Sequence, residues 1–155
     1  MKASLRLILT AGFCLAGMTF LAAADDRQEA IKKERKKYQG TWKVTSYESD
    51  GNKLDEDNAK RFTVVNKADG VWVLQLDGEK NTEGTSEIDP TKNPKTIDFR
   101  ATEGAYKGKI FLGIYELGDD TRKLCYAEPG KDRPTEFSAP AGSGRTLVEF
   151  KREKN

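Results

Sequence analysis

Gly40-Thr41-Trp42-Lys43-Val44-Thr45 is the stretch that decides the fold. It follows a charged segment that is rich in helix-forming residues, and it begins a series of short segments in which apolar and polar residues alternate. Alternation places successive side chains on opposite faces of a strand, so Trp42, Val44 and Ser46 share one face. We therefore expect the first strand of a β domain here, with Tyr47 on the opposite face.

Seven further segments have the length, the alternation and the bordering turn residues of β-strands. With the first strand at 41–47, they lie at 62–65, 71–76, 82–88, 96–100, 110–117, 122–127 and 146–152. The segment at 82–88 is polar, and we assign it mainly because its neighbours need a partner. Short strands joined by brief turns are typical of an all-β meander, sandwich or barrel. We predict an eight-stranded antiparallel up-and-down barrel, because closure removes the exposed sheet edges.

The loops between these strands differ in length in a regular way. In an up-and-down barrel, successive loops alternate between the two ends. One set of loops lies at 49–60, 77–81, 101–108 and 128–145, and the other, shorter set lies at 67–70, 89–94 and 118–120. We therefore expect one elaborated mouth, and we expect the functional residues there, because binding residues concentrate in loops.

Residues 1–24 have the pattern of an export signal. Lys2 and Arg6 precede a mostly apolar run, and Ala22-Ala23-Ala24 provides small residues for cleavage. A membrane anchor is the alternative, but the apolar run is short of the roughly 20 residues that span a bilayer. We therefore expect an exported protein, periplasmic or extracellular, without a membrane span after signal removal.

The sequence is thus divided into a signal peptide at 1–24, a short N-terminal helix at 25–39 and a barrel domain at 40–155. The whole sequence has 27 basic and 25 acidic residues, and two of the basic ones lie in the signal. Removal of the signal leaves no net charge, so no net positive field remains to attract nucleic acid. We expect a monomer that binds no nucleic acid and uses no cofactor.

The sequence contains no histidine. This excludes a Ser-His-Asp triad, a Cys-His pair and every histidine-based metal site. Cys125 is the only cysteine outside the signal, so no intramolecular disulfide can form, and alternation points it away from the barrel interior. Carboxylates are abundant, and a pair of them could act as in glycosidases, but such residues are expected for solubility. We predict that the protein is not an enzyme; a carboxylate hydrolase is the weaker alternative.

Gly40-Thr41-Trp42 resembles the Gly-x-Trp motif that begins the first strand of lipocalin-like (calycin) barrels, after a short N-terminal helix. In that family a basic residue near the end of the last strand packs over the tryptophan, and Arg152 has this place here. The resemblance implies structural roles for Gly40, Trp42 and Arg152. Trp42 would close one end of the barrel, and Arg152 would cover its ring by a cation–π contact. Lys151, on the opposite face, is the alternative.

Several longer motifs are spread over the chain. They are Gln39-Gly40-Thr41-Trp42-Lys43-Val44, Asp89-Pro90-Thr91-Lys92-Asn93-Pro94-Lys95, Gly113-Ile114-Tyr115-Glu116-Leu117, and Leu124-Cys125-Tyr126 through Arg133-Pro134-Thr135-Glu136-Phe137. Together they resemble an uncharacterised exported domain family that is abundant in planctomycete bacteria. The resemblance implies a self-contained domain behind a signal peptide. It implies no established activity, so no catalytic residue is carried over.

Apolar side chains on the predicted inner face either fill the barrel or wall a pocket, because eight-stranded barrels do both. We predict a binding module for a small apolar or amphipathic ligand at the mouth. The alternative is a solid-core protein–protein interaction module of the cell envelope. A cavity of about 300 Å³ or more would favour the ligand. The candidate binding residues are Trp72, Leu74, Phe99 and Tyr126 on the inner face and Tyr115 and Phe137 toward the long loops.

Overall fold

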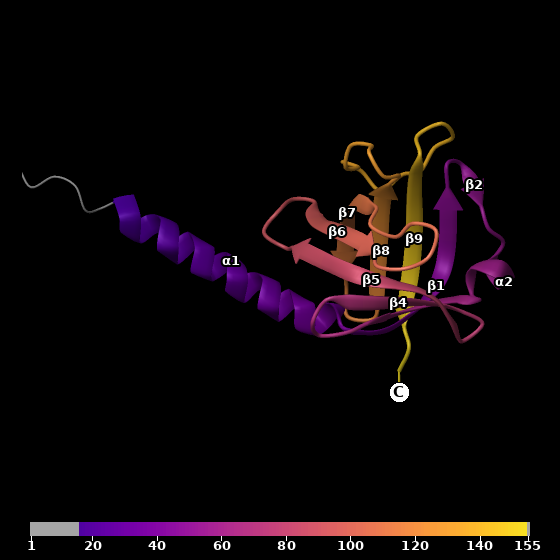
Figure 1. Ribbon diagram of the computed structural model, residues 1–155, viewed down its shortest axis with the longest axis horizontal. Coiled ribbons are helices and arrows are strands. Elements are labelled where there is room, and N and C mark those ends of the chain that lie inside the picture. The colour runs from indigo at the N-terminus through magenta and orange to yellow at the C-terminus, as the bar shows by residue number, and fades with distance from the viewer. Residues whose placement is uncertain (1–15, 155) are drawn as a thin grey trace, which may run out of the picture.

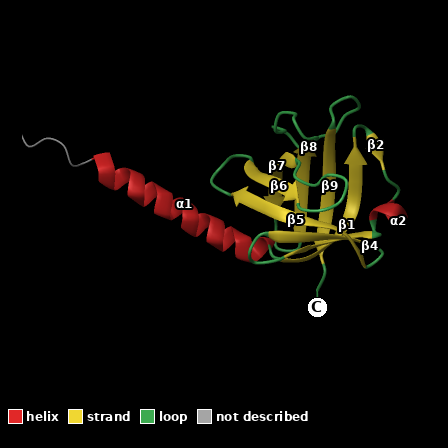
Figure 2. Ribbon diagram, in the orientation of Figure 1, coloured by secondary structure: helices red, strands yellow, loops and turns green. Residues whose placement is uncertain are grey.

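The computed structural model describes residues 16–154 of the 155-residue chain. Within these residues the chain forms two helices and nine strands (Figure 1), which Figure 2 distinguishes by colour. The helices are α1 (Ala16–Tyr38) and α2 (Glu56–Ala59). The strands are β1 (Gly40–Ser49), β2 (Asn52–Lys53), β3 (Phe62–Asn66), β4 (Val71–Leu76), β5 (Glu79–Asp89), β6 (Lys95–Ala101), β7 (Ile110–Leu117), β8 (Thr121–Ala127) and β9 (Arg145–Arg152).

The sheet closes on itself into an antiparallel barrel. Each strand from β3 to β9 pairs with its neighbour in sequence, and β1 pairs with both β3 and β9. β2 is an additional two-residue strand that pairs with the end of β1. Within the described residues, eight strands thus form a closed up-and-down barrel of the lipocalin-like, all-β class, as predicted.

The two ends of the barrel differ, and we name them the closed end and the mouth. The closed end is where β1 begins and β9 ends, since Trp42 of β1 lies opposite Arg152 of β9. It carries the short loops at 67–70, 90–94 and 118–120, whereas the mouth carries the loops at 50–61, 77–78, 102–109 and 128–144. Figure 1 shows long loops at the top, opposite the C-terminus. The predicted asymmetry of the two ends is confirmed.

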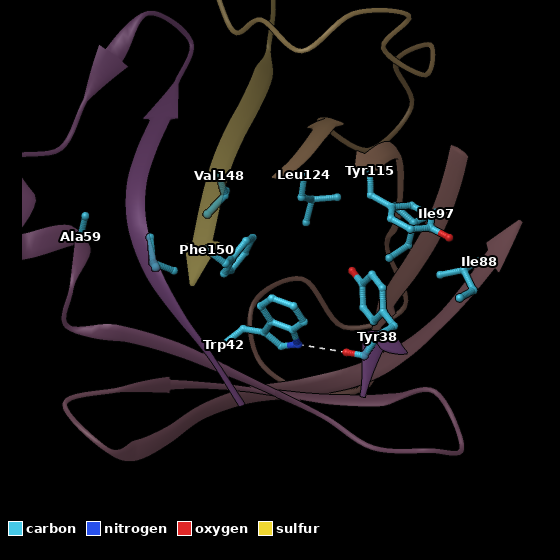
Figure 3. Packing of buried hydrophobic residues seen from close by; sticks show 10 residues of the cluster. Tyr38, Trp42, Ala59, Ile88, Ile97, Tyr115, Leu124, Val148 and Phe150 are labelled. Carbon is cyan, nitrogen blue, oxygen red and sulfur yellow. Dashed lines mark hydrogen bonds between the residues drawn. The ribbon is translucent and has the colours of Figure 1, made fainter. Parts of the chain in front are cut away.

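The hydrophobic core lies toward the closed end (Figure 3). The Trp42 side chain is 0% exposed, and its indole Nε1 donates a 2.9 Å hydrogen bond to the carbonyl oxygen of Tyr38. Arg152 covers the indole, with its guanidinium carbon 4.1 Å from the ring centroid. The buried residues around this pair are Val44, Ile88, Ile97, Tyr115, Leu124, Val148 and Phe150. The structural roles expected for Trp42 and Arg152 agree with this geometry.

A β-bulge in β1 overturns the predicted assignment of faces. The pairing of β1 with β9 shifts by one residue between Val44 and Ser46. Tyr47 therefore lies opposite Val148 and packs against the core, and Ser46 takes the outer face. Strict alternation cannot detect this change, because one extra residue reverses the face of every residue that follows it.

The helix α1 is longer than the predicted segment at 25–39, because it begins at Ala16. Residues 1–15 of the predicted signal peptide lie outside the described residues. No helix in the described part of the chain has both the length and the apolar composition needed to cross a membrane. Figure 1 shows that α1 extends away from the barrel and reaches it only at its C-terminal part.

The C-terminal part of α1 is held on the barrel by polar contacts to β5 and β6. The Arg27 guanidinium lies 3.0 Å from the Asp89 carboxylate, and the Lys95 ammonium lies 2.6 Å from the Glu34 carboxylate. Tyr38, at the end of the helix, is buried. α1 therefore covers part of the closed end and leaves the mouth free.

Candidate functional site

Five aromatic rings form a connected group, which we call the aromatic cluster: Trp72, Phe99, Tyr106, Phe111 and Tyr126. Phe99 and Phe111 are stacked, with their centroids 5.0 Å apart and their planes 5° apart. Tyr126 meets both of these rings edge-on, at 5.0 and 5.8 Å. Trp72 lies 6.0 Å from Phe99, and Tyr106 lies 5.6 Å from Phe111. Four strands and the 102–109 loop supply these rings, so closure of the barrel assembles the cluster.

The strand pairings explain how the rings come together. Phe99 lies directly opposite Phe111 across the β6–β7 pair, which places the two rings on the inner face. Trp72 lies opposite Gly84, and a Cβ atom on Gly84 would be 2.4 Å from the indole. A glycine is therefore required there, because any side chain would displace the ring. The indole Nε1 also donates a 3.1 Å hydrogen bond to the carbonyl oxygen of Thr85, which orients the ring.

The aromatic cluster is more exposed than the core at the closed end. Four of its rings are half-buried, and Tyr106 is 60% exposed. In contrast, the large side chains of the core are each less than a tenth exposed. The cluster is thus a partly accessible aromatic surface on a well-packed barrel.

Uncharged hydroxyl groups lie beside the rings. The Oγ of Ser49 and the Oγ1 of Thr146 are 2.9 Å apart and share a hydrogen bond. The hydroxyls of Thr146 and Tyr47 lie close to the hydroxyl of Tyr126. Burial raises the pKa of Tyr126 well above its usual range, so this phenol stays protonated at physiological pH. On the inner face, the surroundings of Tyr126 therefore offer hydrogen-bonding groups without charge.

Four of the six predicted binding residues lie on the inner face near these groups. Trp72, Phe99 and Tyr126 belong to the aromatic cluster. Leu74 follows Trp72 on the inner face of β4, opposite Val64, and is half-buried. Alternation in sequence therefore located most of the rings that the fold brings together.

We predicted from the sequence that Tyr115 lies toward the mouth, and this prediction is wrong. Tyr115 is 0% exposed at the closed end, where its ring meets Tyr38 edge-on at 5.4 Å. Its hydroxyl donates a 3.3 Å hydrogen bond to the Glu34 carboxylate of α1. The physical reason is the direction of β7, which begins at the mouth, so that a residue near its C-terminal end lies at the other end of the barrel.

Phe137 belongs to a mouth loop but lies away from the aromatic cluster. Its ring centroid is 6.0 Å from the Nζ of Lys123, a residue on the outer face of β8. The 128–144 loop folds back over the outside of the barrel and takes Phe137 with it. The length of this loop was visible in the sequence, but the direction in which it folds was not.

Sequence analysis missed Arg122, which lies inside the closed end. It is 3% exposed, and its guanidinium carbon lies 4.0, 4.7 and 4.8 Å from the ring centroids of Phe150, Tyr38 and Trp42. Its Nε and Nη1 have no hydrogen-bond partner among the described residues, and burial lowers its pKa. The signal in the sequence was alternation: Arg122 and Leu124 are two residues apart in β8, so their side chains share the inner face. The charge of Arg122 made a solvent-exposed position the more obvious expectation.

The described residues contain two hollows, and both are open to solvent. One, of about 560 Å³, lies beside the β7–β8 turn and is lined by outward-facing residues such as Glu116 and Lys123 as well as by the inward-facing Arg122. The other, of about 430 Å³, lies beside α2 and is lined by residues such as Lys60 and Arg61. Neither hollow is lined by a residue of the aromatic cluster.

Other chemical groups in the described residues do not form a reaction centre. No group of three or more Cys, Asp or Glu side chains in residues 16–154 could hold a metal ion. Cys125 points outward from β8, as predicted, and it is buried under the 128–144 loop, where its Sγ lies 3.5 Å from the carbonyl oxygen of Ser138. Burial raises the pKa of the Cys125 thiol, which makes it a poor nucleophile.

No family model, no curated protein and no solved structure matches this chain. Its function therefore has to be inferred from the barrel, the aromatic cluster and the charges around them.

Proposed function

We propose that this protein is an exported, non-enzymatic binding module that holds a small apolar or amphipathic ligand against the aromatic cluster. The observation that carries this proposal is the connected group of five rings, four of them half-buried and one largely exposed. Aromatic rings provide large, rigid contact surfaces at a low cost in conformational entropy. A partly exposed group of such rings can therefore bind a flat or apolar molecule by direct contact.

The groups next to the rings favour a ligand that is also weakly polar. Ser49, Tyr47, Thr146 and Tyr126 supply hydroxyl groups, and the pKa of Tyr126 is raised by burial, so that it stays neutral. Neutral donors and acceptors in a half-buried site can form hydrogen bonds with a ligand that carries hydroxyl, carbonyl or ether groups. They do not supply the counter-charge that an ionised ligand would need.

The same surroundings favour binding over catalysis. Rings, aliphatic side chains and protonated hydroxyls border the cluster, and none of these groups is a base or an activated nucleophile at physiological pH. The sequence has no histidine to activate one of the hydroxyls. The barrel therefore supplies shape and apolar contact rather than proton transfer.

The experiment that tests the proposal uses Trp72 as a reporter and N-phenyl-1-naphthylamine, a neutral aromatic fluorophore, as the probe. We expect saturable binding to residues 25–155, with energy transfer from tryptophan to the probe. Trp72→Phe should lower this transfer, because Trp72 belongs to the aromatic cluster, and Trp42 in the core accounts for the transfer that remains. Phe111→Ala should weaken binding by about tenfold, since truncated aromatic anchors typically cost this much or more.

Phe137→Ala is the matched control, because this ring lies on the outside of the barrel, near Lys123. It should leave the affinity for the probe unchanged. The proposal fails if the unmodified protein shows no saturable binding, or if Phe111→Ala and Phe137→Ala have the same effect.

A second candidate is a protein–protein interaction module of the cell envelope with a solid core. The observation that favours it is the position of the two hollows, neither of which is lined by a residue of the aromatic cluster. Under this alternative the mouth loops contact another protein, and the fluorophore finds no saturable site. The probe experiment therefore separates the two candidates.

A further inference from the structure

The exposed large hydrophobic side chains of residues 24–154 lie in one segment of the chain. Tyr106 is 60% exposed and Ile110 is 42% exposed, and no other large hydrophobic side chain in residues 24–154 is exposed to this degree. Both belong to the segment that joins β6 to β7. Single exposed hydrophobic residues are ordinary, but two neighbouring ones on an otherwise polar surface indicate an interaction site.

The segment that carries these two residues is held by its own hydrogen bonds. The backbone N–H of Gly108 donates to the carbonyl of Ala101 at 2.8 Å, and that of Lys109 donates to Tyr106 at 2.9 Å. The ring of Tyr106 is also braced by the ring of Phe111, 5.6 Å away. Tyr106 is therefore presented in a fixed position, which lowers the entropic cost of binding a partner.

Basic residues surround the two hydrophobic ones. Arg100 lies directly opposite Ile110 in the β6–β7 pair, and Lys107 and Lys109 flank Tyr106 in the loop; all three are exposed. Within the described part of the chain none of the three lies within 4.0 Å of a carboxylate. We name the β6–β7 patch for these five residues: Arg100, Tyr106, Lys107, Lys109 and Ile110.

Neighbouring carboxylates do not neutralise the β6–β7 patch, because they are paired with other cations. Glu83 and Glu103 both lie 3.0 Å from the ammonium of Lys80. Asp98 lies 2.6 Å from the guanidinium of Arg133. The patch thus keeps three cations around two apolar side chains, although the chain without the predicted signal has no net charge.

We propose that the β6–β7 patch is a docking surface for an acidic segment of a partner protein that carries an apolar or aromatic side chain between its carboxylates. The carboxylates would complement Arg100, Lys107 and Lys109, and the apolar side chain would contact Tyr106 and Ile110. Tyr and Arg are the residue types that contribute most to protein interfaces. Complementary charge provides fast, specific encounter.

The position of Arg100 favours a polypeptide over a membrane surface. Arg100 lies on the outer face of β6, below the loop that carries Tyr106, so the cations continue along the strands. A chain segment that runs along the strands contacts all three cations, whereas a flat bilayer touches only the tip of the loop. The proposal is independent of the proposed function, because Ile110 and Arg100 face outward and only Tyr106 is shared with the aromatic cluster.

The test measures binding of a fluorescently labelled glutamate–tyrosine copolymer to residues 25–155 by anisotropy, with labelled poly-L-glutamate as the purely acidic comparison. We expect the copolymer to bind more tightly than poly-L-glutamate, and we expect affinity to fall as salt rises to about 0.15 M. Ile110→Ser and Tyr106→Ala should each weaken copolymer binding by about tenfold and leave poly-L-glutamate binding unchanged. The triple variant Arg100→Gln, Lys107→Gln, Lys109→Gln should lose binding of both polymers.

The matched control removes the same charge elsewhere, through Lys33→Gln, Lys67→Gln and Lys92→Gln, which replace exposed lysines away from the mouth. It should bind the copolymer like the unmodified protein. An equal loss in this control would overturn the proposal, because binding would then be general electrostatic attraction. Tyr106-dependent binding to phosphatidylglycerol vesicles, without preference for the copolymer, would also overturn it.

Ile110→Ser distinguishes this proposal from the proposed function. Ile110 lies outside the aromatic cluster, so this variant should keep its affinity for N-phenyl-1-naphthylamine while it loses affinity for the copolymer. If Ile110→Ser keeps its copolymer binding, the docking surface is refuted and the ligand proposal is unaffected.

Discussion

At the scale of single residues, two guanidinium groups lie against the buried indole of Trp42, and they differ in how their charge is compensated. Arg152 lies 4.1 Å from the ring, and it donates to the backbone carbonyls of Gln39, Lys37 and Asp119. Arg122 lies 4.8 Å from the same ring, but two of its nitrogens have no partner among the described residues. Arg152 thus links the end of α1 and the 118–120 loop to β9 by hydrogen bonds, whereas the charge of Arg122 is buried in the core.

Replacement of Trp42 by alanine should destabilise the protein strongly. The indole is 0% exposed and donates a hydrogen bond to Tyr38, so its removal leaves a large cavity at the closed end. We expect Trp42→Ala to lower the free energy of unfolding by about 3–5 kcal/mol. Urea denaturation followed by circular dichroism measures this, and an unchanged unfolding midpoint would show that the indole does not close the barrel.

Replacement of Arg122 separates the role of its charge from the role of its volume. A buried cation without a carboxylate is costly, although the three rings around it repay part of the cost. Arg122→Met keeps much of the side-chain volume and should be as stable as the unmodified protein, or more stable by roughly 1–4 kcal/mol. Arg122→Ala should be less stable than Arg122→Met by about 2–5 kcal/mol, because it leaves a cavity. Equal destabilisation in the two variants would show that the charge itself is needed.

At the scale of elements, the 128–144 loop acts as a strap on the outside of the barrel. Arg133 donates to the carbonyl oxygens of Ile97 and Gly113, at 3.0 and 2.7 Å, and thereby fastens the loop across β6 and β7. Pro134 in the loop is buried, and Cys125 of β8 lies beneath it at 0% exposure. The strap explains why Ile114 of β7 and Cys125 of β8 are buried although they face outward.

Loosening of the strap should expose Cys125. Burial raises the pKa of its thiol and blocks access, so reaction with Ellman's reagent should be slow in the unmodified protein. Arg133→Gln removes the fastening and should increase the rate of reaction by about tenfold or more, because local opening becomes easier. Arg61→Gln, which breaks an exposed ion pair with Asp77, is the control and should leave the rate unchanged. Equal rates in all three proteins would show that other contacts hold the strap.

Most strands could be predicted from sequence because local patterns determine them. β4 and β7 have the predicted bounds, since each combines apolar residues with clear turn residues on its flanks. β5 extends beyond the predicted segment at 82–88, because β4 and β6 pair with its backbone on both sides. This pairing outweighs the low strand propensity of its polar side chains. The two-residue strand β2 was missed because its residues are those of a turn.

The candidate site was predictable only in part, because it depends on register and on the paths of loops. Phe99 and Tyr126 were found, since alternation alone places them on the inner face. Phe111 was missed as a partner of Phe99, because only the β6–β7 register puts the two residues opposite each other. Tyr115 and Phe137 were misplaced for the same kind of reason: position along a strand and folding of a loop are properties of the whole chain.

At the scale of the whole molecule, stability and binding are assigned to opposite ends of the barrel. The closed end contains the buried indole, the two arginines and the docked part of α1. The aromatic cluster and the β6–β7 patch extend toward the mouth, where side chains are half-buried or exposed. Changes at the patch should therefore affect binding with little effect on folding, which makes the proposed variants informative.

Two tyrosines with raised pKa values, the buried Tyr115 and the half-buried Tyr126, should make the whole fold sensitive to alkali. Burial raises the pKa of Tyr115 and of Tyr126 well above the ordinary value of 10.0. Above that value the unfolded chain loses these protons while the folded chain retains them, so the free energy of unfolding falls as pH rises. We expect stability against urea to be unaffected by these two groups below pH 10 and to decrease steadily above it, with phenolate absorbance appearing together with unfolding.

Tyr126→Phe isolates the contribution of one of these groups. The variant lacks the hydroxyl that lies close to Thr146 and Tyr47, so it should be slightly less stable at neutral pH, but its stability should fall less steeply above pH 10. Tyr106→Phe removes a hydroxyl from a residue that is 60% exposed, and it should keep the alkaline slope of the unmodified protein. If Tyr126→Phe loses stability as steeply as the unmodified protein, the phenol is not protected inside the barrel, and the aromatic cluster is more open to water than its ring contacts indicate.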